Sequence, residues 1–259
     1  MARVQELMTP EPLKVPHDAA GPDCARVMWR LSLRHLPVVG RKGDLVGVIS
    51  DFDVLQHGEI VGEDGRWKDR ATGNVQARAL ARTTWVEARP DDDLAAVLRE
   101  MRDLQRDVTV VVNDERHPIG IITEHDAVRW ARAVLLDRPA VLLDARRVHT
   151  VSADDAGFSA FDAMISHNVR HLVVVEGSAP VGVLSWRDLI VEELVSYRDV
   201  TVGALVRSGP IFMAPLATPL TELAEIMIRH KVGAVPLLGD DGALVGIASR
   251  TDVIDAALG

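Results

Sequence analysis

Gly47-Val-Ile-Ser-Asp-Phe-Asp53 is the first of four similar stretches in this chain of 259 residues. Each stretch consists of a glycine, two apolar residues, a serine or threonine, two variable residues and an aspartate. The copies span Gly47–Asp53, Gly120–Asp126, Gly182–Asp188 and Gly246–Asp252. A methionine in a helical pattern precedes each glycine by 18 or 19 residues, and these are Met28, Met101, Met164 and Met227. Spacing that is kept through every copy indicates an internal structural repeat, and we predict that the methionines fill the core.

Each copy has the same order of predicted secondary structure. An apolar run, typical of a buried strand, lies between the methionine and the glycine. These runs are Leu36–Val39, Val108–Val112, Leu172–Val175 and Val235–Leu238. A turn follows each run, and the apolar pair of the motif then supplies the second strand of a hairpin. Residues after the aspartate, such as Ala127–Arg132 and Leu189–Leu194, have a helical pattern. The unit is therefore predicted to be strand, helix, strand, strand, helix.

A unit of this size cannot bury both faces of its own sheet, so neighbouring copies are expected to pair. We predict an α+β fold of four β-α-β-β-α repeats that pair into two modules, 1–135 and 136–259. The repeats are placed at about 1–57, 74–133, 139–195 and 199–259. The boundary between modules falls near Leu136–Pro139, although the most glycine-rich connector, His57–Gly73, lies between the first two copies.

Composition limits the classes of function. With 47% apolar and 26% charged residues, the chain has the balance of an ordinary globular protein. A formal net charge of −9 argues against a phosphate-backbone interface, so we expect no nucleic acid partner. No apolar run is long enough to span a bilayer, and the start lacks a signal pattern. We therefore expect a soluble cytoplasmic protein in which the single cysteine, Cys24, is a buried and inert thiol.

The motif supports two chemical interpretations. Its hydroxyl residues are Ser50, Thr123, Ser185 and Ser249, and the aspartates three residues later are Asp53, Asp126, Asp188 and Asp252. At a strand-to-helix junction, a hydroxyl and free backbone N–H groups favour a phosphate, and an ionised aspartate can accept hydrogen bonds from two ribose hydroxyls. The same spacing also fits a capping box, in which hydroxyl and carboxylate satisfy the first turn of the helix. Both interpretations stay open at this point.

The recurring Gly-x-x-Ser/Thr-x-x-Asp with its upstream apolar strand resembles the CBS (cystathionine-β-synthase) domain. This domain occurs as tandem pairs, called Bateman modules, in the AMP-activated kinase γ subunit, in inosine monophosphate dehydrogenase and in many stand-alone bacterial proteins. The resemblance covers nearly the whole chain. It implies a regulatory or sensor protein and not an enzyme. The expected ligands are AMP, ADP, ATP or S-adenosylmethionine, with no required cofactor and with Mg²⁺ only as a companion of the nucleotide.

Basic residues precede the middle strand in every copy, and by resemblance such positions reach the phosphates. They are Arg34 and His35, Arg106, Arg170 and His171, and His230 and Lys231. Copies one and three, which have an Arg-His pair, are the preferred sites. Copies two and three replace the proline of this strand with Thr109 and Val173. Trp186 is expected either to stack on a ligand or to fill the site, and Arg250 either to contact phosphate or, as the more frequent outcome, to be exposed.

A ligand-free scaffold is the alternative function. In that interpretation the repeats dock to a second copy, as a homodimer through the faces of the modules, or to an unidentified regulated protein. An enzyme is not expected, because neither a Gly-x-Ser-x-Gly elbow nor a Walker-type phosphate loop is present. The acidic run Asp91–Asp93 is interpreted as a helix N-terminus. No transition-metal site is predicted, since His167 and His171 fall on either side of a change from helix to strand.

Overall fold

The computed structural model describes residues 2–61, 66–69, 75–135, 139–140, 148–189, 200–206 and 211–259. Its backbone contacts divide the chain into two compact units, Met1–Ala127 and Val128–Gly259. The module boundary predicted between residues 135 and 136 stays a prediction, and residues 136–138 lie outside the described part. The same holds for the helix expected over 189–194 beyond Leu189.

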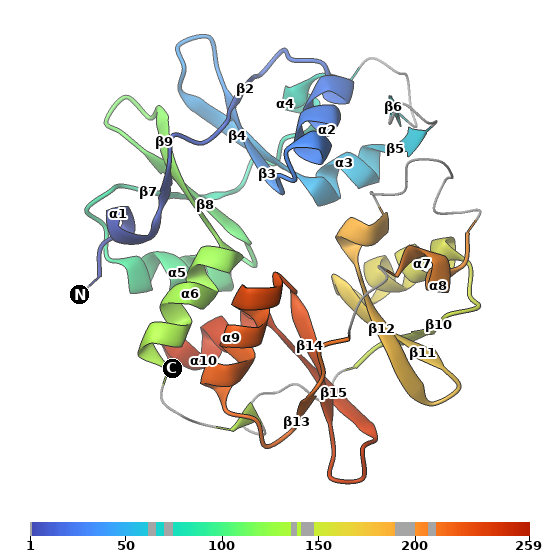
Figure 1. Cartoon of the computed structure of the whole chain (residues 1–259). Coiled ribbons are helices and arrows are strands. Elements are labelled where there is room, and N and C mark those ends of the chain that lie inside the picture. Colours follow the sequence, from blue (N-terminus) through green and yellow to red (C-terminus); the bar gives the residue numbers. More distant parts are fainter. Residues whose placement is uncertain are drawn as a thin grey trace. The chain divides into compact units, whose positions relative to one another are not determined.

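The first unit contains copies one and two of the repeat (Figure 1). Copy one consists of α1 (Val4–Leu7), β1 (Thr9–Pro10), β2 (Val15–Pro16), α2 (Gly21–Arg30), β3 (His35–Val39), β4 (Leu45–Ser50) and α3 (Asp51–His57). The glycine-rich connector that follows contains a hairpin of β5 (Gly58–Val61) and β6 (Arg66–Asp69). Copy two consists of α4 (Ala77–Leu80), β7 (Val86–Ala88), α5 (Leu94–Asp103), β8 (Val108–Val112), β9 (Pro118–Thr123) and α6 (Glu124–Val134), whose last turns belong to the second unit.

The second unit repeats this order of elements with copies three and four. Copy three has β10 (Thr150–Ser152), α7 (Gly157–His167), β11 (His171–Glu176), β12 (Ala179–Ser185) and the 3₁₀ helix η2 (Trp186–Leu189). Copy four has α8 (Val202–Leu205), β13 (Ala214–Pro215), α9 (Leu220–His230), β14 (Ala234–Leu238), β15 (Leu244–Ser249) and α10 (Arg250–Leu258). The predicted α+β class is confirmed, and so is the strand, helix, strand, strand, helix order in copies one, two and four; in copy three the described part of the last helix is η2.

Every copy builds the same small sheet. A short parallel strand pairs with the middle strand, which pairs in turn with the motif strand in an antiparallel hairpin. The middle strands also share an irregularity, because the register shifts between Val38/Val39, Val111/Val112, Val174/Val175 and Leu237/Leu238. Such a bulge bends a strand and increases its twist. Its recurrence at one place shows that the sequence repeat is also a backbone repeat.

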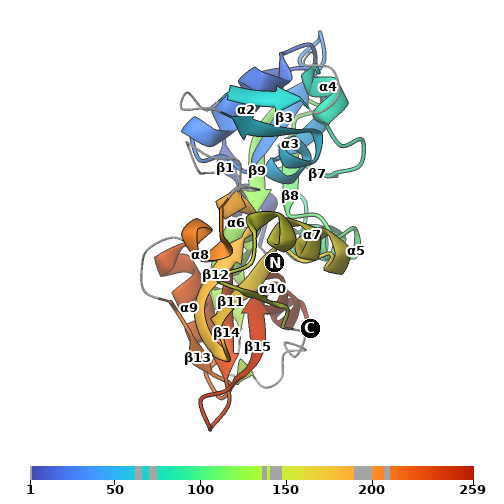
Figure 2. The same cartoon turned by 90° about the vertical axis from the view of Figure 1, so that its right-hand side faces the viewer.

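The two copies of the first unit exchange their leading segments. Strand β1, from copy one, pairs with β9 of copy two through Thr9 and Ile121 (Figure 2). In the opposite direction, Arg82 of copy two forms a bridge with Val48 on β4 of copy one. Each leading segment therefore covers the edge of the other copy's sheet, which places side chains of one copy beside the motif of the other.

Helices and sheet meet in a largely aliphatic core. In copy one, Met28 and Cys24 of α2 pack on Leu36 and Ile49 of the hairpin. The other faces of the hairpins of copies one and two pack on each other, in a cluster of Leu45, Val48, Val108, Val110 and Val112. All the predicted core methionines are buried. The prediction for the acidic run is also confirmed, because Asp93 caps α5 by accepting a hydrogen bond from the Ala96 N–H at 3.3 Å.

No helix in the described part of the chain is long and apolar enough to cross a membrane.

Candidate functional site

The motif forms the same hydrogen-bonded pair in all copies. The aspartate Oδ2 accepts the backbone N–H of the serine or threonine at distances of 2.8, 2.9, 2.7 and 2.6 Å in copies one to four. It also accepts the side-chain hydroxyl at 2.6, 2.8, 2.5 and 2.5 Å, in the same order. The helix begins at the residue after the hydroxyl, so the aspartate lies in its first turn. The carboxylate half of the capping box is therefore formed in every copy. In copies one and four the hydroxyl completes the box, because it accepts the aspartate N–H at 3.2 and 3.4 Å.

A second bond fixes the residue that precedes the middle strand. Its carbonyl accepts the N–H of the first helical residue after the motif hydroxyl. The four bonds are Asp51 to Arg34 at 2.9 Å, Glu124 to Asp107 at 3.1 Å, Trp186 to Arg170 at 2.9 Å and Arg250 to Gly233 at 3.1 Å. The predicted phosphate contacts Arg34 and Arg170 are thus tied through their backbone to the N-terminus of the helix that their motif opens.

The strand register corrects the sequence comparison of the basic residues. Ser50, Thr123, Ser185 and Ser249 pair with His35, Val108, His171 and Ala234. The residue before the strand is therefore arginine in copies one and three, but Asp107 in copy two and Gly233 in copy four. Arg106 lies one position further from the strand than Arg34 does. The Arg-His pair consequently distinguishes the odd copies from the even ones.

The register also corrects the predicted replacement of the strand proline. Pro37 pairs with Val48, and its equivalent in copy two is Val110, which pairs with Ile121. Val173 does occupy the proline position in copy three, through its pair with Val183. Thr109 is instead equivalent to Leu36, because Thr109 pairs with Ile122 as Leu36 pairs with Ile49.

The histidine of each odd copy reaches the even copy of the same unit. In the first unit, His35 Nε2 lies 3.1 Å from Oδ2 of Asp107, and the His35 side chain is only 3% exposed. In the second unit, the imidazole of His171 packs so closely on Gly233 that a side chain there would overlap with it. Asp107 and Gly233 are equivalent in register. Both predicted histidines therefore lie at the junction between two copies.

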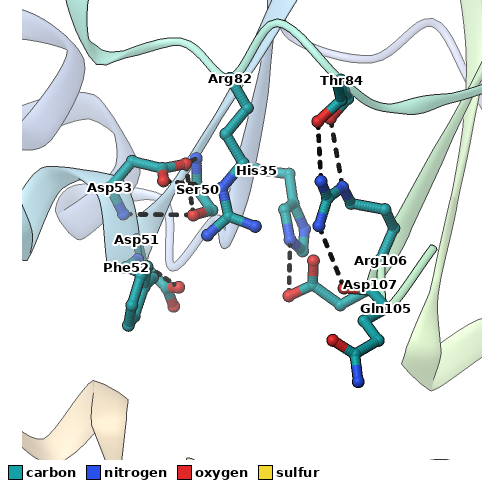
Figure 3. A network of polar contacts seen from close by, with 10 residues as sticks. All are labelled: His35, Ser50, Asp51, Phe52, Asp53, Arg82, Thr84, Gln105, Arg106 and Asp107. Carbon is teal, nitrogen blue, oxygen red and sulfur yellow. Dashed lines mark hydrogen bonds and ion pairs between the residues drawn. The ribbon is translucent and has the colours of Figure 1, made fainter. Parts of the chain in front are cut away.

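The site of copy one contains an arginine that was not predicted. Arg82 comes from copy two, and its Nε donates to Asp53 Oδ1 at 2.7 Å (Figure 3). Its guanidinium also lies 5.4 Å from the centre of the Phe52 ring. Both oxygen atoms of Asp53 are thus engaged, since Oδ2 serves the capping box. The sequence did contain a signal, because copies two and four share Ala-Leu-x-Arg in Ala79–Arg82 and Ala204–Arg207, although Arg207 lies outside the described residues.

The remaining candidates fall into different surroundings. Arg106 is held by Thr84, whose Oγ1 and carbonyl accept its Nη2 and Nε at 2.7 and 3.2 Å (Figure 3). Trp186 is buried and stacks on Phe161 of α7 at 5.3 Å between ring centres, so it fills its own copy. The expectation that Arg250 is exposed is wrong, because its side chain is buried at the start of α10 and its Nη2 lies 3.5 Å from the Lys231 carbonyl. No group of three or more potential metal ligands occurs among the described residues.

Paired hairpin repeats, each opening a helix with a hydroxyl-carboxylate cap, define the class of protein. The family model for the CBS domain matches residues 4–59, 77–133, 143–194 and 202–259. The chain therefore belongs to the CBS-domain family.

Solved structures of similar fold extend over the whole chain. One is protein MJ1225 from Methanocaldococcus jannaschii, described as a proposed archaeal homologue of γ-AMPK. It has a TM-score of 0.83 at 20% identity, and the match covers 98% of this chain and 99% of MJ1225. An uncharacterized conserved protein from Pyrococcus horikoshii has a TM-score of 0.69 at 21% identity, with coverage of 99% of this chain and 100% of that one. At these identities the likeness concerns the fold.

Curated relatives include an enzyme. The inosine-5'-monophosphate dehydrogenase of Korarchaeum cryptofilum is 30% identical over 128 residues, which are 49% of this chain and 25% of the enzyme. The chain thus spans about a quarter of that protein, and 39% of the uncharacterized protein MJ1404 from Methanocaldococcus jannaschii.

Proposed function

We propose that this protein is a regulatory nucleotide sensor that binds adenosine nucleotides at its motif sites. The observation that carries the proposal is the state of Arg34 in copy one. Its side chain is partly buried, yet it makes no hydrogen bond or ion pair to any described residue. Its carbonyl is bonded to the N-terminus of α3, directly after Ser50. A cation without an anion beside a helix N-terminus is suited to a phosphate group.

The capping boxes are compatible with a ligand. In copy four, the cap uses Oδ2 of Asp252, while Oδ1 makes no hydrogen bond to any residue in the described ranges. A carboxylate offers about four acceptor positions, so a ribose hydroxyl can bind without breaking the cap. The proposed ribose contacts are accordingly Asp53, Asp126, Asp188 and Asp252, with Ser50, Thr123, Ser185 and Ser249 beside them. Arg34, His35, Arg170 and His171 remain the proposed phosphate contacts. Arg106, which lies one position further from its strand and bonds to Thr84, is proposed only as a more distant contact in copy two.

The proposed output is regulatory. A nucleotide that binds between two copies prefers the arrangement of the copies that contacts it on both sides, and so shifts the population of states. His35 and His171 already link the two copies of their units, and they would transmit such a shift. No catalytic step and no required cofactor enter this proposal.

Calorimetric titration of the full chain with AMP, ADP, ATP and S-adenosylmethionine tests it, with and without MgCl₂. Binding of at least one compound is expected, and Arg34→Met should weaken the phosphate-bearing ligands by roughly ten-fold or more. Arg41, an exposed arginine in the turn after β3, provides the matched control as Arg41→Met. Absence of heat and of any thermal shift at millimolar ligand would refute the sensor.

One observation favours the scaffold as a second candidate. Phe158 and Ile165 lie two turns apart on α7 and are 41% and 40% exposed. A second copy of the chain is the proposed occupant of this face. Sedimentation velocity of the wild type and of Phe158→Ser with Ile165→Ser tests this candidate, because a scaffold of this kind dimerises and the double variant does not.

A further inference from the structure

The motif carboxylate of copy one already forms an ion pair within the protein. Asp53 is 5% exposed, and its Oδ2 accepts two bonds from Ser50 while Oδ1 accepts Arg82 Nε. The Arg82 side chain is 27% exposed, and neither of its Nη groups makes a hydrogen bond to a described residue. Arg82 thus contributes one N–H to Asp53 and keeps its outer N–H groups available (Figure 3).

The backbone fixes Arg82 in this place. Its N–H donates to the Val48 carbonyl at 2.9 Å, which holds the segment after α4 on the motif strand of copy one. Thr9 takes the corresponding position in copy two, since it follows α1 by the same two residues and pairs with Ile121, as Arg82 pairs with Val48. A guanidinium therefore belongs to the copy one site, where the copy two site has a hydroxyl. The two sites of one unit are chemically different.

An ion pair in this position sets conditions on a ligand. A ribose diol that binds Asp53 competes with Arg82 Nε for the carboxylate, and a displaced Arg82 is a partly buried cation without a partner. Leaving one member of such a pair unpaired is costly. A ligand that carries a phosphate removes this cost, because the guanidinium can transfer its N–H groups from Asp53 to the phosphate oxygens in a forked geometry.

We propose that copy one binds its ligand by ion-pair exchange through Arg82, and therefore selects ligands that have both a vicinal diol and a phosphate. Nucleoside phosphates fulfil both conditions. A neutral nucleoside such as adenosine leaves Arg82 unpaired, and 2'-deoxy-AMP leaves Asp53 without its second donor. The inference rests on the proposed function and adds the class of ligand that copy one accepts.

The test uses the full chain with Asp126→Asn, Asp188→Asn and Asp252→Asn, which reports on copy one alone. AMP should bind more tightly than adenosine by roughly ten- to a hundred-fold, the range that a hydrogen-bonded charge pair provides. Adding Arg82→Met should weaken AMP and tighten adenosine, because the competitor for Asp53 is gone. A plain phosphate contact would weaken AMP and leave adenosine unchanged. Arg78→Met, an exposed arginine on α4, is the matched control and should change neither affinity.

A ligand series on the same background gives a readout without Arg82→Met, should that variant fail to fold. It compares AMP, adenosine, 2'-deoxy-AMP and 2'-deoxyadenosine. Ion-pair exchange predicts that removing the diol and the phosphate together lowers the binding free energy by less than the sum of the two separate losses. If the two contacts were independent, the losses would be additive. Additive losses, or equal affinity for AMP and adenosine, would overturn the inference. So would an unoccupied copy one in a full chain that binds AMP elsewhere, while no binding by the unmodified chain would instead refute the proposed function.

Discussion

Replacing Asp53 with alanine should destabilise the protein more than replacing Asp252, although both aspartates form the same capping box. Asp252 bonds only to Ser249 among the described residues, through the backbone N–H and the hydroxyl. Asp53 makes the same two bonds to Ser50 and also holds Arg82. Asp252→Ala therefore measures the cap, and Asp53→Ala measures the cap together with the ion pair.

The magnitudes follow from these contacts. Loss of a cap lowers the free energy of unfolding by about 1 kcal/mol. Breaking a fully buried ion pair costs about 3–5 kcal/mol, whereas an exposed pair contributes below about 1 kcal/mol. The Arg82 side chain is 27% exposed and can turn towards water, so we expect about 1–2 kcal/mol from the pair. Asp53→Ala should thus cost about 2–3 kcal/mol and Asp252→Ala about 1 kcal/mol.

Urea denaturation followed by far-ultraviolet circular dichroism measures both values by linear extrapolation. A cycle of Asp53→Ala, Arg82→Met and the double variant isolates the pair, with an expected coupling of about 1–2 kcal/mol. Equal losses for Asp53→Ala and Asp252→Ala, or a coupling near zero, would refute the view that Arg82 and Asp53 form a stabilising pair in the absence of ligand.

Three further predictions concern groups outside the motif. Thr109 is fully buried and its Oγ1 has no hydrogen-bond partner in the described part of the chain, so Thr109→Val should raise the free energy of unfolding by about 1 kcal/mol in the same urea assay. The hydrogen bond from Arg116 lowers the pKa of Glu87 below its usual 4.5, so this pair stabilises the protein above that value and loses its effect as the pH falls through the lowered pKa. The difference in stability between wild type and Glu87→Gln should accordingly stay below about 1 kcal/mol at neutral pH and vanish in acid, and a difference that grows in acid would contradict the assignment. Burial raises the pKa of the Cys24 thiol to about 11, so a thiol reagent at neutral pH should label the native protein far more slowly than the urea-unfolded chain, and equal rates would show that the thiol is accessible.

The fold could be predicted from the sequence because the same motif and spacing recur in every copy of the repeat. The constant interval between methionine and glycine predicted the order of one helix and two strands in each copy. The methionine marks the helix, the apolar run marks the middle strand and the glycine marks the motif strand. The register of the middle strands was harder to predict, because the run Val108–Val112 contains no proline and can be aligned with Leu36–Val39 in several ways. The strand pairing of Val110 with Ile121, which fixes the alignment, is a property of the hairpin and not of the run.

The candidate site was predicted where it depends on local sequence. The hydroxyl and aspartate of the motif are three residues apart, and their geometry follows from the start of a helix. Arg82 is 29 residues from Asp53, and it reaches the site only because the leading segments of copies one and two are exchanged. Asp107 likewise meets His35 across the junction of the two copies. Such contacts depend on how copies pair, which no single motif encodes.

Capping and ligand binding are the two roles that the sequence suggests for the motif aspartate, and they use different oxygen atoms of its carboxylate. The cap takes Oδ2 and holds the carboxylate at the helix N-terminus, which is also the orientation that a ribose would require. In copy four Oδ1 is then left without a described partner, whereas in copy one Arg82 takes it. The cap is therefore the device that positions the carboxylate, and the occupant of Oδ1 is what differs between sites. An assay that removes the aspartate tests both roles at once, and only exchange of the partner on Oδ1, as in Arg82→Met, separates binding from folding.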